Sequence, residues 1–95
     1  MFVRLTYIYF LPGQAEAAKK IFNEEIIPVV EQQKGNESIM LLEPTDTSGE
    51  FISLTIWKSS IDAQGYESSG IYKELVNKAS HTFSKAAVLK SYNEV

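Results

Sequence analysis

The chain has 95 residues, no cysteine and a formal net charge of −3 at pH 7. The absence of cysteine excludes a disulfide, a Cys-ligated metal and a thiol nucleophile, and the acidic balance argues against nucleic acid, whose partners usually carry a basic face. No run of about 18 apolar residues is present to span a bilayer, and the first residues lack the regions of a signal peptide. We expect a single domain over residues 1–95, located in the cytoplasm, with no nucleic-acid or membrane partner.

Residues 2–11 form the first predicted strand, because β-branched and aromatic residues dominate the segment. Both faces of this strand are largely apolar, whereas a strand with one face in water would carry polar residues there. We therefore expect the chain's own helices to cover one face and a second molecule to cover the other. Alternation places Val3, Leu5, Tyr7, Tyr9 and Leu11 on one face and Phe2, Arg4, Thr6, Ile8 and Phe10 on the other.

A long helix is predicted over residues 14–33, because apolar residues recur there near the helical period. Pro28 lies inside this pattern, and a proline within a helix removes one backbone hydrogen bond and bends the axis. Since the apolar pattern continues on both sides of Pro28, we expect one kinked helix. The segment Lys34-Gly35-Asn36 is expected to end it.

Hydrophobic patterning predicts three more strands, and the two that are close in sequence are expected to pair as an antiparallel hairpin. Ser59 is a candidate N-cap, with Asp62 three residues later in the manner of a capping box. The helix that follows is expected to break at Ser68-Ser69-Gly70 and to resume from Ile71 to about Phe83. The three strands are predicted over residues 38–43, 50–57 and 86–92.

The order of these elements is β-α-β-β-α-β, which indicates an α+β fold of the ferredoxin-like, split βαβ type. Such a fold has an antiparallel four-stranded sheet with helices on one face. The other face would expose an apolar patch of the kind that marks an interface, and a two-fold dimer is the commonest way to cover it. We therefore predict a homodimer formed through the sheet face that carries Val3, Leu5, Tyr7 and Tyr9.

Five short segments carry a family resemblance. They are Leu11-Pro-Gly-Gln14, Ile27-Pro28-Val29, Glu31-Gln-Gln-Lys-Gly35, Leu54-Thr-Ile-Trp-Lys-Ser59 and Tyr66-Glu-Ser-Ser-Gly-Ile-Tyr-Lys73. In this order and spacing they resemble the antibiotic-biosynthesis-monooxygenase-like family, and the match covers nearly the whole chain. The resemblance implies ferredoxin-like protomers that pair into a dimeric α+β barrel, in agreement with the expected dimer.

The resemblance also implies a pocket between the sheet and the helices. Several members of the family are cofactor-independent oxygenases that act on quinol-like or polyketide aromatics, and another branch binds and degrades haem. Ile71 stands where many members carry a histidine, and Val76 lies near the position of the haem-ligating histidine. Thr6 stands in place of a catalytic asparagine of that branch, whose tryptophan matches Trp57. Haem degradation in the known manner is therefore not expected, and an atypical haem-binding member is the weaker alternative.

Six residues are candidates for binding a small aromatic ligand in such a pocket. If Trp57 faces the helices, then Thr55 and Ser53 face them too. Arg4 shares the face of Thr6, and a cation on a covered face needs a partner or a ligand anion. Structural alternatives stay open: core packing for the aromatic residues, ordinary strand positions for the threonines, and solvent contact for the arginine. The candidates are Arg4, Thr6, Thr55, Trp57, Tyr66 and Tyr72.

No residue is assigned a catalytic role. His81, the only histidine, is expected near the end of a helix, where the helix dipole favours an imidazolium without any function. No Ser/His/Asp arrangement, phosphate loop or metal-ligand spacing is present. The glutamates of the predicted helices are interpreted as solvated surface charges; they are Glu24, Glu25, Glu31, Glu67 and Glu74.

The sequence favours a monooxygenase that acts on a small aromatic or quinol-like compound and uses no metal or other cofactor. The substrate is expected to lose a proton and to react directly with O2, while Arg4, Thr6 or Tyr66 donates hydrogen bonds to the anion. Because the family's histidines are missing, no base is evident. A non-catalytic, dimeric small-molecule-binding protein of the same fold is therefore the alternative.

Overall fold

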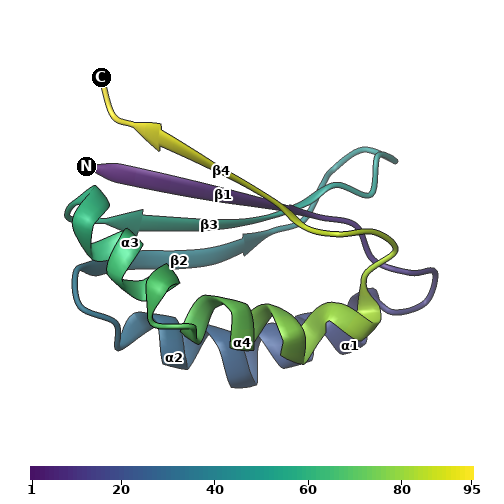
Figure 1. Cartoon of the computed structure of the whole chain (residues 1–95). Coiled ribbons are helices and arrows are strands. Elements are labelled where there is room, and N and C mark those ends of the chain that lie inside the picture. Colours follow the sequence, from purple (N-terminus) through teal and green to yellow (C-terminus); the bar gives the residue numbers. More distant parts are fainter.

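A computed structural model describes all 95 residues of the chain. Its single sheet has the strand order β2-β3-β1-β4, and every neighbouring pair is antiparallel. The helices cover one face of this sheet (Figure 1). This is the ferredoxin-like α+β architecture that the element order predicts. The strands are β1 (Phe2–Ile8), β2 (Asn36–Leu42), β3 (Phe51–Trp57) and β4 (Val88–Asn93).

The first helical stretch is continuous but changes its winding in the middle. It runs from α1 (Ala15–Ile21) through the π-helical segment η1 (Phe22–Ile26) into α2 (Ile27–Glu31). The N–H of Ile27 bonds the carbonyl of Phe22, five residues back. Pro28 follows directly and cannot donate a backbone hydrogen bond, because it has no N–H. The wider π-helical turn lies next to the position where this hydrogen bond is missing. The prediction of one helical stretch rather than two is therefore confirmed, and Pro28 is accompanied by a π-helical turn.

The second helical stretch begins and breaks as predicted. The Ser59 side chain accepts a hydrogen bond from the Asp62 N–H at 3.2 Å and caps α3 (Ser60–Ser68). Gly70, with φ of +87°, separates α3 from α4 (Ile71–Ala79). A short 3₁₀ turn, η2 (Ser80–Thr82), then leads toward the last strand.

The first strand is shorter than predicted. We expected it to reach residue 11, but β1 ends at Ile8, and beyond it only Phe10 pairs, in an isolated bridge with Phe83. The backbone of residues 9–11 instead bonds the segment after α4, because Ser84 N–H donates to the carbonyl of Tyr9. The chain after α4 is thereby tied to the end of β1.

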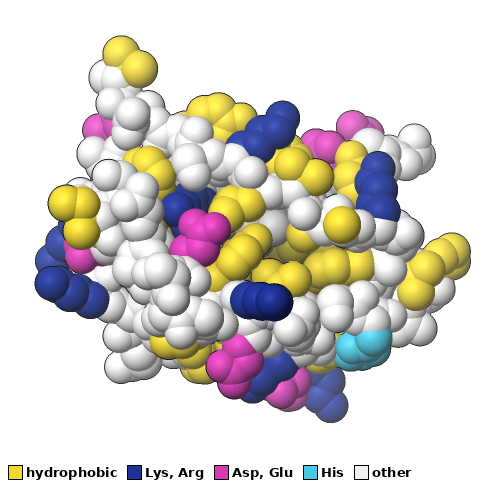
Figure 2. Space-filling view, viewed as in Figure 1, with side chains coloured by type: hydrophobic (Ala, Val, Ile, Leu, Met, Phe, Trp, Pro, Cys, Tyr) yellow, Lys and Arg dark blue, Asp and Glu magenta, His cyan; other side chains and the backbone are white.

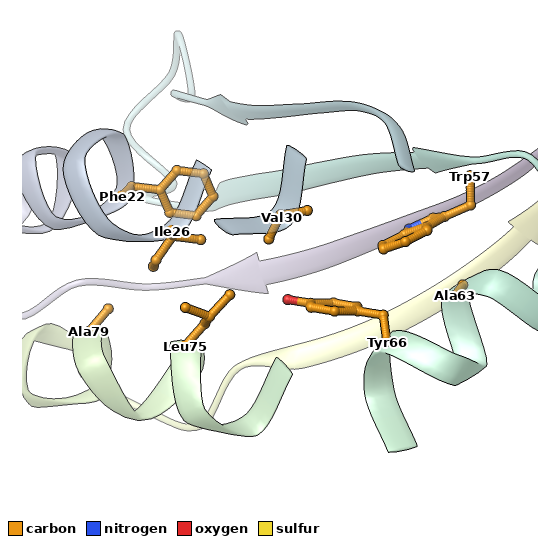
Figure 3. Close-up of a cluster of buried hydrophobic side chains, with 8 residues drawn as sticks. All are labelled: Phe22, Ile26, Val30, Trp57, Ala63, Tyr66, Leu75 and Ala79. Atoms are coloured by element: carbon orange, nitrogen blue, oxygen red, sulfur yellow. The ribbon is translucent and has the colours of Figure 1, made fainter. Parts of the chain in front are cut away.

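The core lies between the sheet and the helices. Arg4, Thr6 and Ile8 of β1 are buried there, which fixes the helix-facing side of the strand as the side that carries Arg4. Figure 3 shows the eight buried residues of the core cluster, which are Phe22, Ile26, Val30, Trp57, Ala63, Tyr66, Leu75 and Ala79.

None of the helices is both long enough and apolar enough to cross a membrane.

Gly35 locks the corner where the first helical stretch turns into β2. Its φ of +81° lies in the left-handed region, and a Cβ added there would collide with the side chain of Asp62 near the start of α3. Its carbonyl accepts a hydrogen bond from the Lys58 N–H at 2.9 Å, directly after β3. Three elements therefore meet at a position that has no room for a side chain.

Replacing Gly35 by alanine should lower the free energy of unfolding more than the same change at Gly49. Gly49 has a similar φ of +72° but open space around it, so Gly49→Ala meets only the cost of the left-handed backbone, about 1–2 kcal/mol. Gly35→Ala adds the collision with Asp62, on the order of 1–3 kcal/mol more. Urea unfolding of the two variants measures the difference, and equal losses would contradict the close packing at Gly35.

Candidate functional site

A cavity lies between the helix-facing side of the sheet and the helices η1 and α4. Fifteen of its 19 lining residues are hydrophobic, so its walls are mostly apolar. Figure 2 shows apolar side chains at the floor of a hollow on the face that α4 borders. The space open to the centre of a water-sized sphere is about 50 Å³, enough for roughly three or four water molecules. The free space in the cavity is therefore small.

The polar groups of the cavity come from two neighbouring strands and two helices. The pairing of β1 with β3 sets Arg4 opposite Thr55 and Thr6 opposite Ser53, so all four side chains share one face. Tyr66 of α3 and Tyr72 of α4 contribute phenol groups from the helices. The lining residues among the sequence candidates are Arg4, Thr6, Thr55, Tyr66 and Tyr72, together with Ser53.

Trp57 is the one candidate that does not line the cavity. It is completely buried, and its ring stacks on that of Tyr66 with centroids 5.1 Å apart. Its indole N–H donates to the Thr55 hydroxyl at 2.9 Å. Figure 3 shows Tyr66 lying parallel to Trp57, with its hydroxyl directed along the core toward Leu75. Of the two roles that the sequence left open for Trp57, core packing is what the geometry displays, because Trp57 supports Tyr66 from behind.

Arg4 is the charged group of the cavity, and only 7% of it is exposed. Its Nη1 lies 2.9 Å from a carboxylate oxygen of Glu67 and 3.4 Å from the carbonyl of Ala63. The guanidinium also lies over the ring of Phe2, 5.6 Å from the centroid. Its Nε has no hydrogen-bond partner at all. An unpaired buried donor is costly, so this atom destabilises the folded chain unless it finds a partner.

Glu67 lies on the solvent-exposed surface of α3, as the sequence predicts. Its carboxylate also pairs with Arg4, which the sequence did not predict. A cation on a covered face needs a partner, so the sequence did indicate that Arg4 would pair with an acidic residue or a ligand anion. The sequence pattern could not say which of the glutamates it was, because the contact joins β1 to α3 across 63 positions.

The two phenols of the cavity stay protonated over a wide range of pH. Their rings meet edge to face, with centroids 5.9 Å apart. Burial raises the pKa of Tyr66 strongly, and burial likewise raises the pKa of Tyr72. The positive charge of Arg4 opposes both pKa shifts without cancelling them. Near neutral pH the two hydroxyls are therefore hydrogen-bond donors and not bases.

Ile71 and Val76, the two positions at which the resemblance implies histidines, are apolar in this chain. Val76 lines the cavity, and Ile71 packs against the core cluster. His81 is exposed in η2 and does not line the cavity. No group of three or more His, Asp or Glu residues is arranged to hold a metal ion. Phe83 and Leu89 also line the cavity, although the sequence did not single them out as site residues.

The family model for antibiotic biosynthesis monooxygenases matches residues 1–78. The chain belongs to this family. No curated protein is similar enough in sequence to be counted as a relative.

Solved structures of the family have the same fold at low sequence identity. A protein from Nitrosomonas europaea described as an antibiotic biosynthesis monooxygenase is 17% identical, with a TM-score of 0.83 over 100% of this chain and 99% of that one. A protein from Deinococcus radiodurans with the same description is 11% identical, with a TM-score of 0.84 over 100% and 93%. A mutant of MhuD with two manganese protoporphyrin IX molecules bound per active site is 19% identical, with a TM-score of 0.83 over 100% and 95%.

The raised phenol pKa values predict how stability depends on pH. Above the pKa of an unfolded tyrosine, about 10, the unfolded chain loses protons that folded Tyr66 and Tyr72 retain, so the free energy of unfolding should fall as the pH rises further. Changing both residues to phenylalanine should make this fall shallower. Urea unfolding at several pH values between about 8 and 11.5 measures the slopes. Identical slopes for the two proteins at alkaline pH would contradict the burial of these phenols.

Proposed function

We propose that the protein is a small monooxygenase that binds a quinol or a similar single-ring phenol in this cavity and lets it react directly with O2. The observation that carries the proposal is the pair of protonated phenols, Tyr66 and Tyr72, that line a mostly apolar cavity. Apolar walls with a few directed donors are what a small aromatic ligand requires. Membership of the monooxygenase family supports the same reaction class.

The donors of the cavity would act on the oxygen of the substrate. A quinol that loses its O–H proton to water leaves an anion, and the hydroxyls of Tyr66, Tyr72 and Thr6 donate hydrogen bonds to the anionic oxygen. Such donors stabilise charge more effectively in an apolar site than in water. A ring carbon of the anion then bonds O2, and the peroxide anion takes back a proton from water. The hydroperoxide loses water to leave a hydroxyquinone. One oxygen atom enters the ring, the other leaves as water, and the substrate supplies all four electrons.

A binding protein without catalysis is the second candidate. The observation in its favour is that no histidine, aspartate or glutamate lines the cavity to accept the substrate's proton. In the proposed reaction, water accepts that proton and the hydrogen-bonded anion is stabilised instead. The two candidates therefore make the same prediction for binding and opposite predictions for oxygen consumption.

Haem does not fit the residues of this cavity. The space of about 50 Å³ is far below the several hundred Å³ of an ordinary cofactor pocket. No histidine lines it, and the raised pKa values of Tyr66 and Tyr72 oppose a phenolate ligand to iron. The porphyrins bound to the MhuD mutant therefore do not carry over to this chain.

We further propose that two copies pair through the uncovered face of the sheet, as in the dimeric α+β barrels that the sequence suggests. Val3, Leu5 and Tyr7 of β1 are only half-buried on this face. Exposed apolar residues of the flanking strands extend the patch; they are Met40, Leu42, Val88 and Tyr92. An apolar face that spans four strands is costly to leave in water.

Oxygen consumption with hydroquinone tests the proposed reaction. We expect consumption above autoxidation and, with ¹⁸O2, one labelled oxygen atom in the hydroxyquinone. Tyr66→Phe or Tyr72→Phe should slow turnover by about a hundred-fold, because each removes one donor to the anion. Tyr92→Phe, on the uncovered sheet face, is the matched control and should leave the rate unchanged. A folded protein that binds hydroquinone without consuming O2 would support the binding candidate and refute the reaction.

Sedimentation equilibrium tests the proposed dimer. The wild-type protein should sediment with twice the mass of one chain. Leu5→Lys puts a charge in the centre of the uncovered face and should yield monomers, whereas Glu37→Lys, an exposed change at the far edge of the sheet, should leave the dimer intact. A monomeric wild-type protein at micromolar concentration would contradict the pairing.

A further inference from the structure

We infer that the free edge of the Arg4 guanidinium binds a carboxylate, so that the substrate is a quinol-type aromatic acid. The inference rests on the proposed function only in taking the cavity as the place where the aromatic ring binds. In the proposed reaction Tyr66, Tyr72 and Thr6 bond the phenol oxygen and Arg4 has no role. The inference gives Arg4 a role in binding a second group of the substrate.

The contacts of Arg4 are confined to one side of its guanidinium. Both the pairing with Glu67 and the hydrogen bond to the Ala63 carbonyl use Nη1. Nε has no partner, and no hydrogen bond from Nη2 is present. The N–H groups of Nε and Nη2 are parallel, which is the fork that binds the two oxygens of one carboxylate. The contacts to Nη1 hold the guanidinium in place, and the Nε–Nη2 edge makes no hydrogen bond. Nε is itself covered by neighbouring side chains, so a carboxylate that bonds it must displace them.

Glu67 balances the charge of Arg4, but it does so from the water-exposed side of α3. Glu67 is half-exposed, with 47% of its side chain in contact with solvent, so water screens its charge, whereas the Arg4 side chain is 91% buried. No acidic residue lines the cavity to repel an incoming carboxylate. Arg4 is also the only arginine in the chain, so nothing else can offer this planar fork.

The distribution of polar groups then selects for a molecule with two different ends. The carboxylate would bond the Arg4 edge, the ring would lie against the apolar walls, and a phenol oxygen would reach the hydroxyls of Tyr66 and Tyr72. A neutral quinol satisfies the second and third of these contacts but leaves Nε unpaired. An aromatic acid that lacks a hydroxyl satisfies only the first two.

Calorimetric titration with 2,5-dihydroxybenzoate and its neutral isostere 2,5-dihydroxybenzamide, without oxygen, tests the inference. The wild-type protein should bind the acid at least roughly ten-fold more tightly, as hydrogen bonds to charged groups predict. Arg4→Lys keeps the charge next to Glu67 but loses the fork, and should lose most of this preference. Lys73→Gln, which removes an exposed positive charge on α4, is the control for general attraction and should keep it.

A second measurement uses the wild-type protein alone, in case Arg4→Lys does not fold. The Nε–H of the only arginine gives one signal in a ¹⁵N–¹H spectrum, and the acid should shift it while the amide should not. Equal affinities for the two compounds, no binding of the acid at millimolar concentration, or an Nε–H signal unmoved by the saturating acid would overturn the inference. A preference for the acid without oxygen consumption would refute the reaction and leave the carboxylate site standing. Turnover of hydroquinone with no preference for the acid would refute the carboxylate site and leave the proposed reaction standing.

Discussion

The stacking of Tyr66 on Trp57 sets how α3 sits against the end of β3, and the cavity depends on it. Trp57 is completely buried, and its only hydrogen bond, to Thr55, anchors it to its own strand. Tyr66 is therefore supported from behind by a rigid ring, which keeps its phenol at the cavity. Removing a buried aromatic ring of this size costs about 3–5 kcal/mol, and here it would also remove one of the contacts that hold α3 on the sheet. The fold and the site thus share one contact.

A second constraint is the burial of a charge within an apolar layer. Arg4 lies in the middle of the sheet face that the helices cover, and an isolated charge there would be strongly destabilising. Glu67 meets that charge from α3, immediately after Tyr66, so the stacked ring and the ion pair approach the sheet on the same helix. The contacts satisfy one end of the guanidinium only. The Nε atom at the other end stays without a hydrogen-bond partner.

The fold was predictable because its signals are local and periodic. Strand alternation, the Ser59 cap and the break at Gly70 each act within a few residues, and the structure confirms all three. The end of β1 was not predictable, because backbone bonds to residues 82–84 decide it. For the site, the sequence predicted which side chains share a face of the sheet: strand alternation placed Arg4 and Thr6 on the same face. The depth of Trp57 and the pairing of Glu67 with Arg4 depend on how α3 docks, which no local pattern encodes.

The central claim is that an aromatic ring binds on the helix-facing side of the sheet. Intermolecular nuclear Overhauser effects between the ring protons of hydroquinone and protein methyl groups, measured without oxygen, test it directly. The account predicts effects to Leu75 and Val76 of α4, which line or border the cavity. Effects confined to Val3, Leu5 and Val88, on the uncovered face, would contradict it.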